Sequence, residues 1–543
     1  MRDSPSFNLI EQPWIRVHRL DGRVDEVSIM GLFESAHESR AIVGEVPTQT
    51  FAILRVLLAI LHRAVEGPRD TSEWHGLWCA HGLPTGAIAE YLETFRERFD
   101  LLHPRTPFYQ VADLRTAKDE VFGLERLIAD VPSGEPYFTT RLKSGLERLS
   151  FAEAARWLVN CQAFDPSGIK SGAVGDPRVQ KGKGYPIGTG WAGRLGGVFA
   201  EGGTLRETLL LNLIADESDY VRFCDADLPA WERLPDTELA DETGMRPLGP
   251  LDLYTWQSRR IRLSTDSSGV SGVLIANGDR IERQNRHSIE PMCAWRRSEG
   301  QEKRLKGGPV YMPLTHDPER LVWRGLSALL PNVTGQKMHM DSAHTLPPAV
   351  LEWIGKLRVE GCLPDDYSVR IRLIAMAYVS KETKTSEIVD DALSLSVSLM
   401  EEASVELGAV AVGAVEDADQ GARALGNLAA NLAEAAGDKG TGARSHAREA
   451  AFSALDRPFR EWLSALSPHG DPIDARGVWQ KVARRIVLEL GRGLLEQSGP
   501  ASWIGREVRG RHVSSAAADL WFRREVARAF ELAAQPEKGG VAA

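Results

Sequence analysis

The character of the sequence changes near residue 390, and this change most constrains the fold. Before it, short alternating apolar stretches and turn-forming residues are mixed with a few stretches of helical periodicity. After it, the chain is rich in Ala, Leu, Glu and Arg, and apolar residues recur at helical spacing between breaks that carry Gly and Pro. We therefore predict an α+β protein, with a mixed α/β domain over residues 1–389 and an antiparallel four-helix bundle over residues 390–543.

Local patterns predict individual elements. Residues 8–33 predict a β-hairpin turning at Asp21-Gly22, followed by a strand. An apolar helix is expected from Pro47, capped by Thr48 or Thr50, and another helix over residues 150–164. Residues 251–323 are predicted to be rich in strands, and a β-hairpin is predicted with its tip at residues 381–384. The bundle is drawn as helical blocks at about residues 391–415, 420–466, 476–497 and 514–534.

Charge is distributed unevenly along the 543 residues. The chain has 65 Lys and Arg against 75 Asp and Glu, a net charge of −10, which argues at face value against nucleic-acid binding. Residues 387–440 alone contain eleven acidic and two basic residues. The rest of the chain is therefore almost neutral and contains locally basic segments, so the overall charge does not exclude a nucleic-acid partner.

Composition excludes several classes of protein. With 43% hydrophobic and 26% charged residues, the chain is typical of globular proteins and unlike disordered or collagenous ones. The sequence has no run of 18 apolar residues of the kind that predicts a membrane helix, and the first residues lack the pattern of a signal peptide. The five cysteines form no C-x-x-C pair, so we expect a cytoplasmic protein without a structural metal or disulfide framework.

Residues 167–197 contain ten glycines, five basic residues and one acid. This composition is incompatible with a regular helix and indicates a loop whose backbone can approach a ligand closely. A connector without any binding role is the alternative.

Four features, taken in order, resemble one family. They are the entry NLIEQPWI at residues 8–15, the stretch ERLIADVPSGEPYF ending at Phe138, the glycine-bearing DPSGIKSGAVGD after WLVNCQAF, and a closing helical region of about 150 residues. With these features the chain resembles the CasA family, the large subunit of the type I-E CRISPR Cascade surveillance complex.

The resemblance implies a binding function without catalysis or cofactor. Members of the family contact the 5′ handle of the CRISPR RNA (crRNA) and recognise the protospacer-adjacent motif of double-stranded target DNA from the minor groove. They help to open the duplex and form the R-loop, and they recruit the helicase-nuclease. The implied partners are therefore crRNA, target DNA, the backbone and small subunits of Cascade and that nuclease, with no membrane.

The resemblance also suggests which residues bind. The glycine loop that would read the motif matches Ser167, Gly168, Lys170, Ser171 and Gly172. The RNA-binding loop would contain Phe138, Arg141 and Lys143, which suit base stacking and phosphate contact. A buried Phe138 among solvated cations is the alternative for this second site.

Two further DNA-contacting elements are implied. A basic finger would lie in GDRIERQNRH, with Arg280, Arg283 and Arg286 as candidates, although these could equally be exposed positions of a strand. A wedge beneath the first base pair would correspond to the hairpin tip formed by Lys381, Glu382, Thr383 and Lys384, which lacks the glutamine often found in relatives.

The third helical block of the predicted bundle carries a row of cations. Lys481, Arg484, Arg485 and Arg492 fall near one helix face, opposite Val482, Ile486 and Leu490. This row predicts a track for DNA or a seam with a neighbouring subunit, and a solvated face is the simpler alternative.

An enzymatic function remains the second hypothesis. In this interpretation the protein is a cytosolic hydrolase whose glycine-rich segment lines a substrate pocket. The spacing Gly188-x-Gly190-x-x-Gly193 lacks the strand-turn-helix context of a dinucleotide site, and neither a P-loop nor a G-x-S-x-G motif is present.

Overall fold

The computed structural model describes residues 6–131, 146–331, 344–364, 367–379, 381–401, 404–467 and 469–534. Close contacts divide the chain into two compact units. Unit 1 consists of Met1–Glu319, Lys337–Pro364 and Val369–Ala392, and unit 2 consists of Arg320–Gln336, Asp365–Ser368 and Leu393–Ala543.

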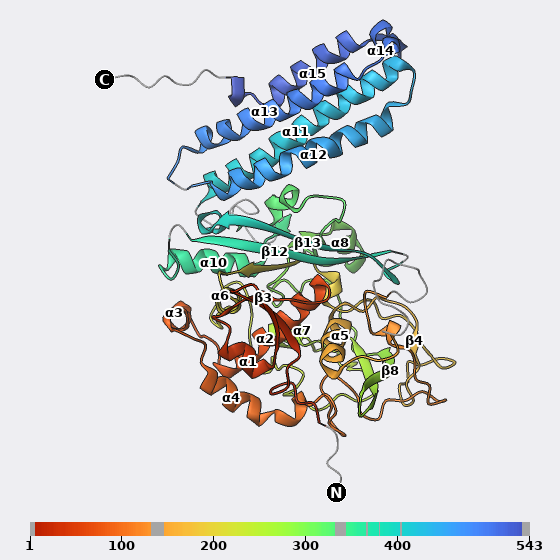
Figure 1. Ribbon diagram of the computed structural model, residues 1–543. Helices are drawn as coiled ribbons and strands as arrows, with labels where there is room; N and C mark the ends of the chain where they lie inside the picture. The colour runs from red at the N-terminus through yellow and green to blue at the C-terminus, as the bar shows by residue number, and fades with distance from the viewer. Residues whose placement is uncertain are drawn as a thin grey trace. The chain divides into compact units, whose positions relative to one another are not determined.

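Small sheets and short helices make up the described part of unit 1 (Figure 1). The strands are β1 (Ile15–Arg19), β2 (Val24–Val27), β3 (Ser39–Ile42), β4 (Lys170–Ser171), β5 (Lys183–Gly184), β6 (Gly197–Glu201), β7 (Arg259–Asp266), β8 (Gly269–Asn277), β9 (Trp295–Arg297), β10 (Tyr311–Pro313), β11 (Thr345–Leu346), β12 (Ser368–Val379) and β13 (Lys384–Ser396). They form sheets with the orders β2-β1-β3, β10-β9-β11, β13-β12-β6 and β5-β4-β8-β7.

Helices pack between and around these sheets. They are α1 (Ile29–Glu34), α2 (Pro47–Ala64), α3 (Thr71–Cys79), α4 (Thr85–Thr94), α5 (Phe151–Phe164), α6 (Leu205–Leu211), α7 (Pro250–Tyr254), α8 (Glu299–Leu305) and α10 (Ala349–Val359). The mixture of helices and strands confirms the α+β class that the sequence predicts.

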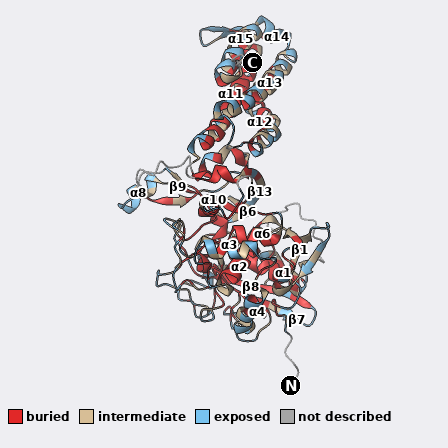
Figure 2. Cartoon of the chain, turned by 90° about the vertical axis from the view of Figure 1, so that its left-hand side faces the viewer, coloured by how far each residue is buried: buried red, intermediate tan, exposed pale blue. Residues whose placement is uncertain are grey.

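The predicted N-terminal elements are present, with two corrections. The segment after the hairpin is predicted as a strand but forms helix α1, because Ser28 caps it by accepting a hydrogen bond from the N–H of Gly31, and the next strand, β3, begins only at Ser39. Strands β1 and β2 pair in antiparallel register from Ile15 opposite Val27 to His18 opposite Val24. Helix α2 begins at Pro47 as expected, but its cap is Val46 and not a threonine. A proline in the first turn explains this start, because it has no N–H to satisfy and its φ is already helical. Figure 2 shows the many buried residues of α2.

Helix α5 delivers the chain to the glycine-rich segment. Its N-cap residue, Ser150, accepts a hydrogen bond from the N–H of Glu153 at 3.1 Å. The helix face that carries Trp157 is buried, and Trp157 itself is 0% exposed. α5 packs against β8, and β4, formed by Lys170 and Ser171 in the second half of the glycine loop, pairs with β8. The loop is thus held at both ends by regular structure.

The second half of the glycine-rich segment belongs to the core. Trp191 is buried in a cluster with Trp256 and Trp295. A Cβ atom at Gly190 would lie 2.4 Å from the carbonyl oxygen of Ala163, so only glycine fits there. The glycines after residue 186 therefore serve close packing, and the backbone available to a ligand is that of the first half.

The described residues of unit 2 form four long helices, which lie side by side in Figure 1. They are α11 (Val405–Ala436), α12 (Gly440–Ser464), α13 (Pro472–Glu496) and α15 (Ser515–Ala529), with the short helix α14 (Pro500–Ile504) and the hairpin of β14 (Arg506–Val508) and β15 (Arg511–Val513) before α15. Helix α11 contacts the other three long helices, and Trp479 of α13 donates a hydrogen bond to the carbonyl of Ala414 at 2.9 Å.

The start of the helical region differs from the expectation. Residues 391–396 continue strand β13, and one uninterrupted helix, α11, covers only residues 405–415 of the first predicted block together with the beginning of the second. The alternation of Leu393, Leu395 and Val397 with serines has the period of a strand, and these three apolar residues are buried. Within the described ranges, no helix is both long and apolar enough to cross a bilayer.

Candidate nucleic-acid interface

The glycine loop follows α5 directly and has an open apex. Gly168 has a φ of +145°, a conformation that other residues rarely adopt, and a Cβ atom there would meet no neighbour. The next residue, Ile169, is 58% exposed. The apex thus presents bare backbone and one apolar side chain, whereas Ser167 is buried and Gly172 packs against Gly182.

A buried arginine fixes the base of the loop. Arg259 is 1% exposed and donates hydrogen bonds to the carboxylate of Asp165 at 2.5 Å and to the carbonyl of Pro166 at 3.2 Å. It also donates to the carbonyl of Gly188 at 2.8 Å. One guanidinium group therefore ties together the chain entering the loop and the chain after it.

Lys170 lies differently from what the sequence predicts. Its ammonium group forms an ion pair with Asp165 at 2.5 Å, and its side chain is 16% exposed. Burial acts to raise the pKa of Asp165, but the charges of Lys170 and Arg259 outweigh this effect and hold the pKa below its usual range. Lys170 is thus engaged inside the protein, with its partner ionised, and does not extend toward solvent.

The hairpin tip is the turn between β12 and β13. Lys381 and Glu382 have φ values of 61° and 65°, as in tight hairpin turns, and the N–H of Thr383 donates to the carbonyl of Val379 at 3.2 Å. Lys381 and Thr383 are exposed, and Glu382 and Lys384 are half-buried. The tip is therefore a compact turn that presents polar side chains.

The glycine loop and the hairpin tip line one cavity of about 540 Å³, although some 200 residues separate them in the sequence. The described lining comes from residues 125–129, 131, 160–161, 164–170 and 383–385, together with Pro186, Ile275 and Met376. Tyr378 of β12 connects the two parts, because its hydroxyl donates to the carbonyl of Phe164 at 2.6 Å. The fold thus brings the predicted motif reader and the predicted wedge to one place.

The basic-finger candidates have three different environments. Arg283 forms a two-pronged ion pair with Glu382 of the hairpin tip, at 2.6 and 2.7 Å. Arg280 is exposed and pairs with Glu282 at 2.9 Å. Arg286 is half-buried, and burial lowers its pKa despite the nearby charge of Glu282. Of the three, Arg283 is the one that contacts the hairpin tip.

The RNA-binding candidates Phe138, Arg141 and Lys143 lie outside the described residues. Arg148, at the end of the same predicted loop, pairs with Asp266 at the turn between β7 and β8, at 2.5 Å.

The row of cations on α13 is largely open to solvent. Lys481, Arg485 and Arg492 are exposed, and Arg484 is half-buried. The packed face of the helix is Trp479, Ala483, Val487 and Gly491, and not the expected Val482, Ile486 and Leu490, which are half-buried. The observed buried face is displaced by about one residue around the helix from the predicted face, a difference that sequence periodicity alone resolves poorly.

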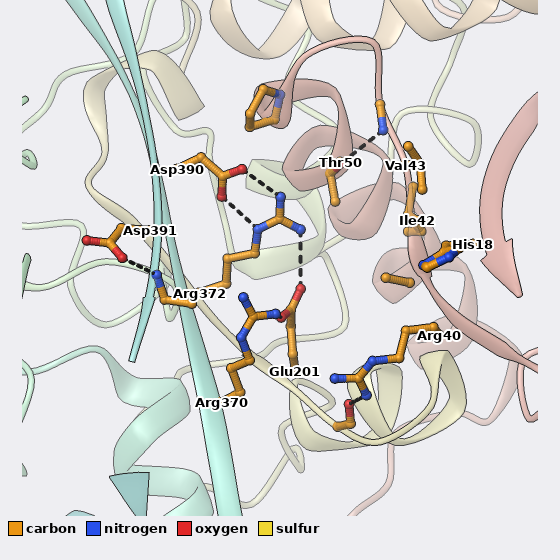
Figure 3. A pocket seen from close by; sticks show the side chains of 15 residues that line it. His18, Arg40, Ile42, Val43, Thr50, Glu201, Arg370, Arg372, Asp390 and Asp391 are labelled. Carbon is orange, nitrogen blue, oxygen red and sulfur yellow. Dashed lines mark hydrogen bonds and ion pairs between the residues drawn. The ribbon is translucent and has the colours of Figure 1, made fainter. Parts of the chain in front are cut away.

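A second cavity, of about 680 Å³, is polar and was not predicted (Figure 3). Arg372 pairs with Asp390 at 2.8 Å and with Glu201 at 3.2 Å, and Glu201 also pairs with Arg370 at 2.5 Å. Arg40 donates to the carbonyl of Gly202 at 2.7 Å. Since its residues come from five distant segments, no sequence signal marks this cavity.

Comparison with known proteins identifies the class. The fold is that of CRISPR-associated proteins: it matches the crystal structure of Thermobifida fusca Cse1 with a TM-score of 0.91 and 48% identity, over 98% of this chain and 99% of that one. The CasA/Cse1 protein of Thermus thermophilus is 32% identical over 506 residues, which are 89% of this chain and 91% of that protein. A chain of a CRISPR RNA-guided surveillance complex shares the fold at 18% identity, with a TM-score of 0.65 over 97% of this chain and all of that one.

The family model for CRISPR-associated protein Cse1 matches residues 8–490. The chain therefore belongs to the Cse1 family, also called CasA, and the family resemblance in the sequence is confirmed.

Proposed function

We propose that this chain is the non-catalytic large subunit of a type I-E CRISPR surveillance complex, which recognises the protospacer-adjacent motif of target DNA and begins to open the duplex. The observation that carries this proposal is the shared cavity of the glycine loop and the hairpin tip. A motif reader and a duplex opener must act on neighbouring base pairs. Their proximity here supports the two roles together.

The glycine loop suits a minor groove. That groove is about 6 Å wide and offers mostly hydrogen-bond acceptors, so its reader must be slim. Backbone at Gly168 and the exposed side chain of Ile169 meet this requirement, and apolar side chains inserted between base steps are common among minor-groove proteins. Since Lys170 is paired with Asp165, we assign it the task of holding the loop, with phosphate contact falling to other cations.

The hairpin tip suits the wedge. Opening a duplex costs a few kcal/mol for each base step that is unstacked, and contacts with a stiff protein element can offset this cost. The tip is stiffened by its own tight turn, in which the N–H of Thr383 donates to the carbonyl of Val379. Because Arg283 contacts the tip, we assign it, among the three candidates, the phosphate contact beside the opened base pair.

The remaining roles follow from the family. We propose that the chain works in the cytoplasm and binds the crRNA 5′ handle, the Cascade backbone and small subunits and the helicase-nuclease. The long helices of unit 2 would form the antiparallel four-helix bundle and offer the cations of α13 to the displaced DNA strand or to a neighbouring subunit.

The hydrolase alternative finds less support. The cavity beside the glycine-rich segment has no histidine among its described lining residues, and its one cysteine is Cys161. Burial raises the pKa of the Cys161 thiol well above its usual range, which keeps it protonated and a poor nucleophile. We therefore favour binding over hydrolysis.

The experiment is a gel-shift titration of the assembled complex, at fixed salt, on a duplex that carries the motif. Gly168→Val should weaken binding by about tenfold or more, because a branched side chain would be strained at this φ and would thicken the loop. Gly361→Val is the control, since Gly361 also has a positive φ and open space around it. Equal affinity of the two variants would remove the glycine loop from the function.

A further inference from the structure

The cavity between the glycine loop and the hairpin tip has walls that groove reading does not use. Its volume of about 540 Å³ lies in the range of sites that enclose small organic ligands, about 300–1,000 Å³. Apart from Ile169, which is assigned to the groove, much of the described wall is apolar, formed by Leu127, Ile128, Phe164, Ile275 and Met376. A flat organic ring would fit such walls better than a phosphate would.

One polar group in this wall lacks a partner. Asn160, in the last turn of α5, lines the cavity and is 1% exposed. Its Oδ1 atom has no hydrogen-bond partner within the described residues. A buried amide oxygen is nearly always hydrogen-bonded, so an unpaired one in a cavity wall indicates a ligand that donates to it. The carboxamide offers an acceptor beside a donor, which is the pattern that pairs with the edge of a nucleobase.

We propose that this cavity receives an unpaired nucleobase of the DNA that is opened at the hairpin tip. The inference rests on the proposed function and adds a binding site to it. Extruded bases are typically held by apolar side chains against their faces and by hydrogen bonds to their polar edge, and this wall provides both.

The cavity lies beside the hairpin tip, which suggests what a base bound there would do. Thr383, Lys384 and Thr385 at its edge belong to the hairpin that would separate the first base pair, so a displaced base has a short path into it. A base held there cannot pair again with its former partner. Binding the opened form alone shifts the equilibrium between closed and opened duplex toward opening.

The test compares target duplexes with and without a base at the first unpaired position, in each strand in turn, bound by the complete complex. Met376→Trp fills the cavity, and Asn160→Leu removes the carboxamide from another wall. Each variant should weaken binding by about tenfold when the base is present and should have no effect on the abasic duplex. Met312→Trp on β10 is the control for introducing a tryptophan away from the cavity: Met312 is half-buried whereas Met376 is buried, and this variant should behave like the unchanged chain on both duplexes.

The outcomes separate this inference from the proposed function. A short duplex that ends at the motif needs no opening, and Gly168→Val should weaken binding to it whether or not the cavity takes a base. If that effect is present and both cavity variants lower affinity equally with and without the base, the base site is refuted while the function stands. The inference would also be refuted if the effect of the cavity variants depended on a base of the guide RNA and on no base of the DNA, because the base in the cavity would then belong to the RNA. Loss of the Gly168 effect would refute the function itself.

Discussion

Single residues in this protein have partners that the sequence did not suggest. Lys170 and Arg283 were both expected to face DNA, and both form ion pairs with carboxylates of their own chain. Their exposure differs, since the side chain of Lys170 is 16% exposed and that of Arg283 37%. An exposed pair is easily exchanged for another anion, whereas the buried pair is held because Asp165 would lose one of its two cationic partners, Lys170 and Arg259. We therefore expect Arg283, and not Lys170, to exchange its carboxylate for a phosphate.

The exchange can be tested at Glu382. Glu382→Gln removes the charge that competes with DNA for Arg283, so duplex affinity should rise by a factor of up to about five, the worth of an exposed ion pair. Glu282→Gln is the matched control, because it removes the partner of the exposed Arg280. Fluorescence anisotropy with a short motif duplex at low salt measures both variants. Identical affinities of the two would mean that Arg283 does not contact DNA.

At the scale of elements, glycines have two different structural roles. Gly168 leaves an open apex on a loop, whereas Gly190 and Gly491 allow other groups to pack closely. The sequence shows a glycine in each case, and only the neighbours reveal which kind it is. The bundle helix α13 provides the clearest test of the second kind.

A Cβ atom at Gly491 would lie 2.3 Å from the ring of Phe522 on α15. Gly491→Val should therefore destabilise unit 2 by about 1–3 kcal/mol through overpacking. Gly493→Val on the same helix meets nothing within 4 Å and controls for the helix propensity of valine. Urea denaturation, followed by tryptophan fluorescence, compares them. If both variants unfold at the same urea concentration, the packing of α13 against α15 is not as described.

At the scale of the whole molecule, the net charge of −10 conceals a separation of charge along the chain. An acidic stretch surrounds the start of α11, while α13 presents Lys481, Arg485 and Arg492 to solvent. If these three cations track DNA, the complex should lose affinity steeply as salt rises, because each phosphate contact releases counterions.

Replacing the three cations with alanine should reduce the slope of log affinity against log salt by about 0.7–0.9 for each lost contact. Binding is measured on a full target at several salt concentrations between about 50 and 200 mM. The control replaces Lys303 and Arg304, which are exposed on the short helix α8 of unit 1. An unchanged slope would assign the α13 cations to a solvated face or to a protein neighbour.

Local patterns in the sequence determined much of the fold. Alternation and the turn at Asp21-Gly22 predicted the first hairpin, and helical spacing predicted α2, α5 and the long helices of unit 2, because these signals depend on neighbours a few residues away. The start of the first long helix was placed too early, at residue 391 and not at Val405, since the helical composition of the following residues outweighed the strand-like alternation of Leu393 and Leu395.

Tertiary structure alone decided the site. The sequence proposed the glycine loop and the hairpin tip separately, but only the folded chain places both on one cavity and turns Lys170 inward to Asp165. The orphaned amide of Asn160 was also invisible in the sequence, where it lies within an ordinary apolar helix. The physical reason is distance along the chain: periodicity reports which face of an element is buried, whereas the gathering of residues 160, 170 and 384 around one cavity depends on how whole elements pack.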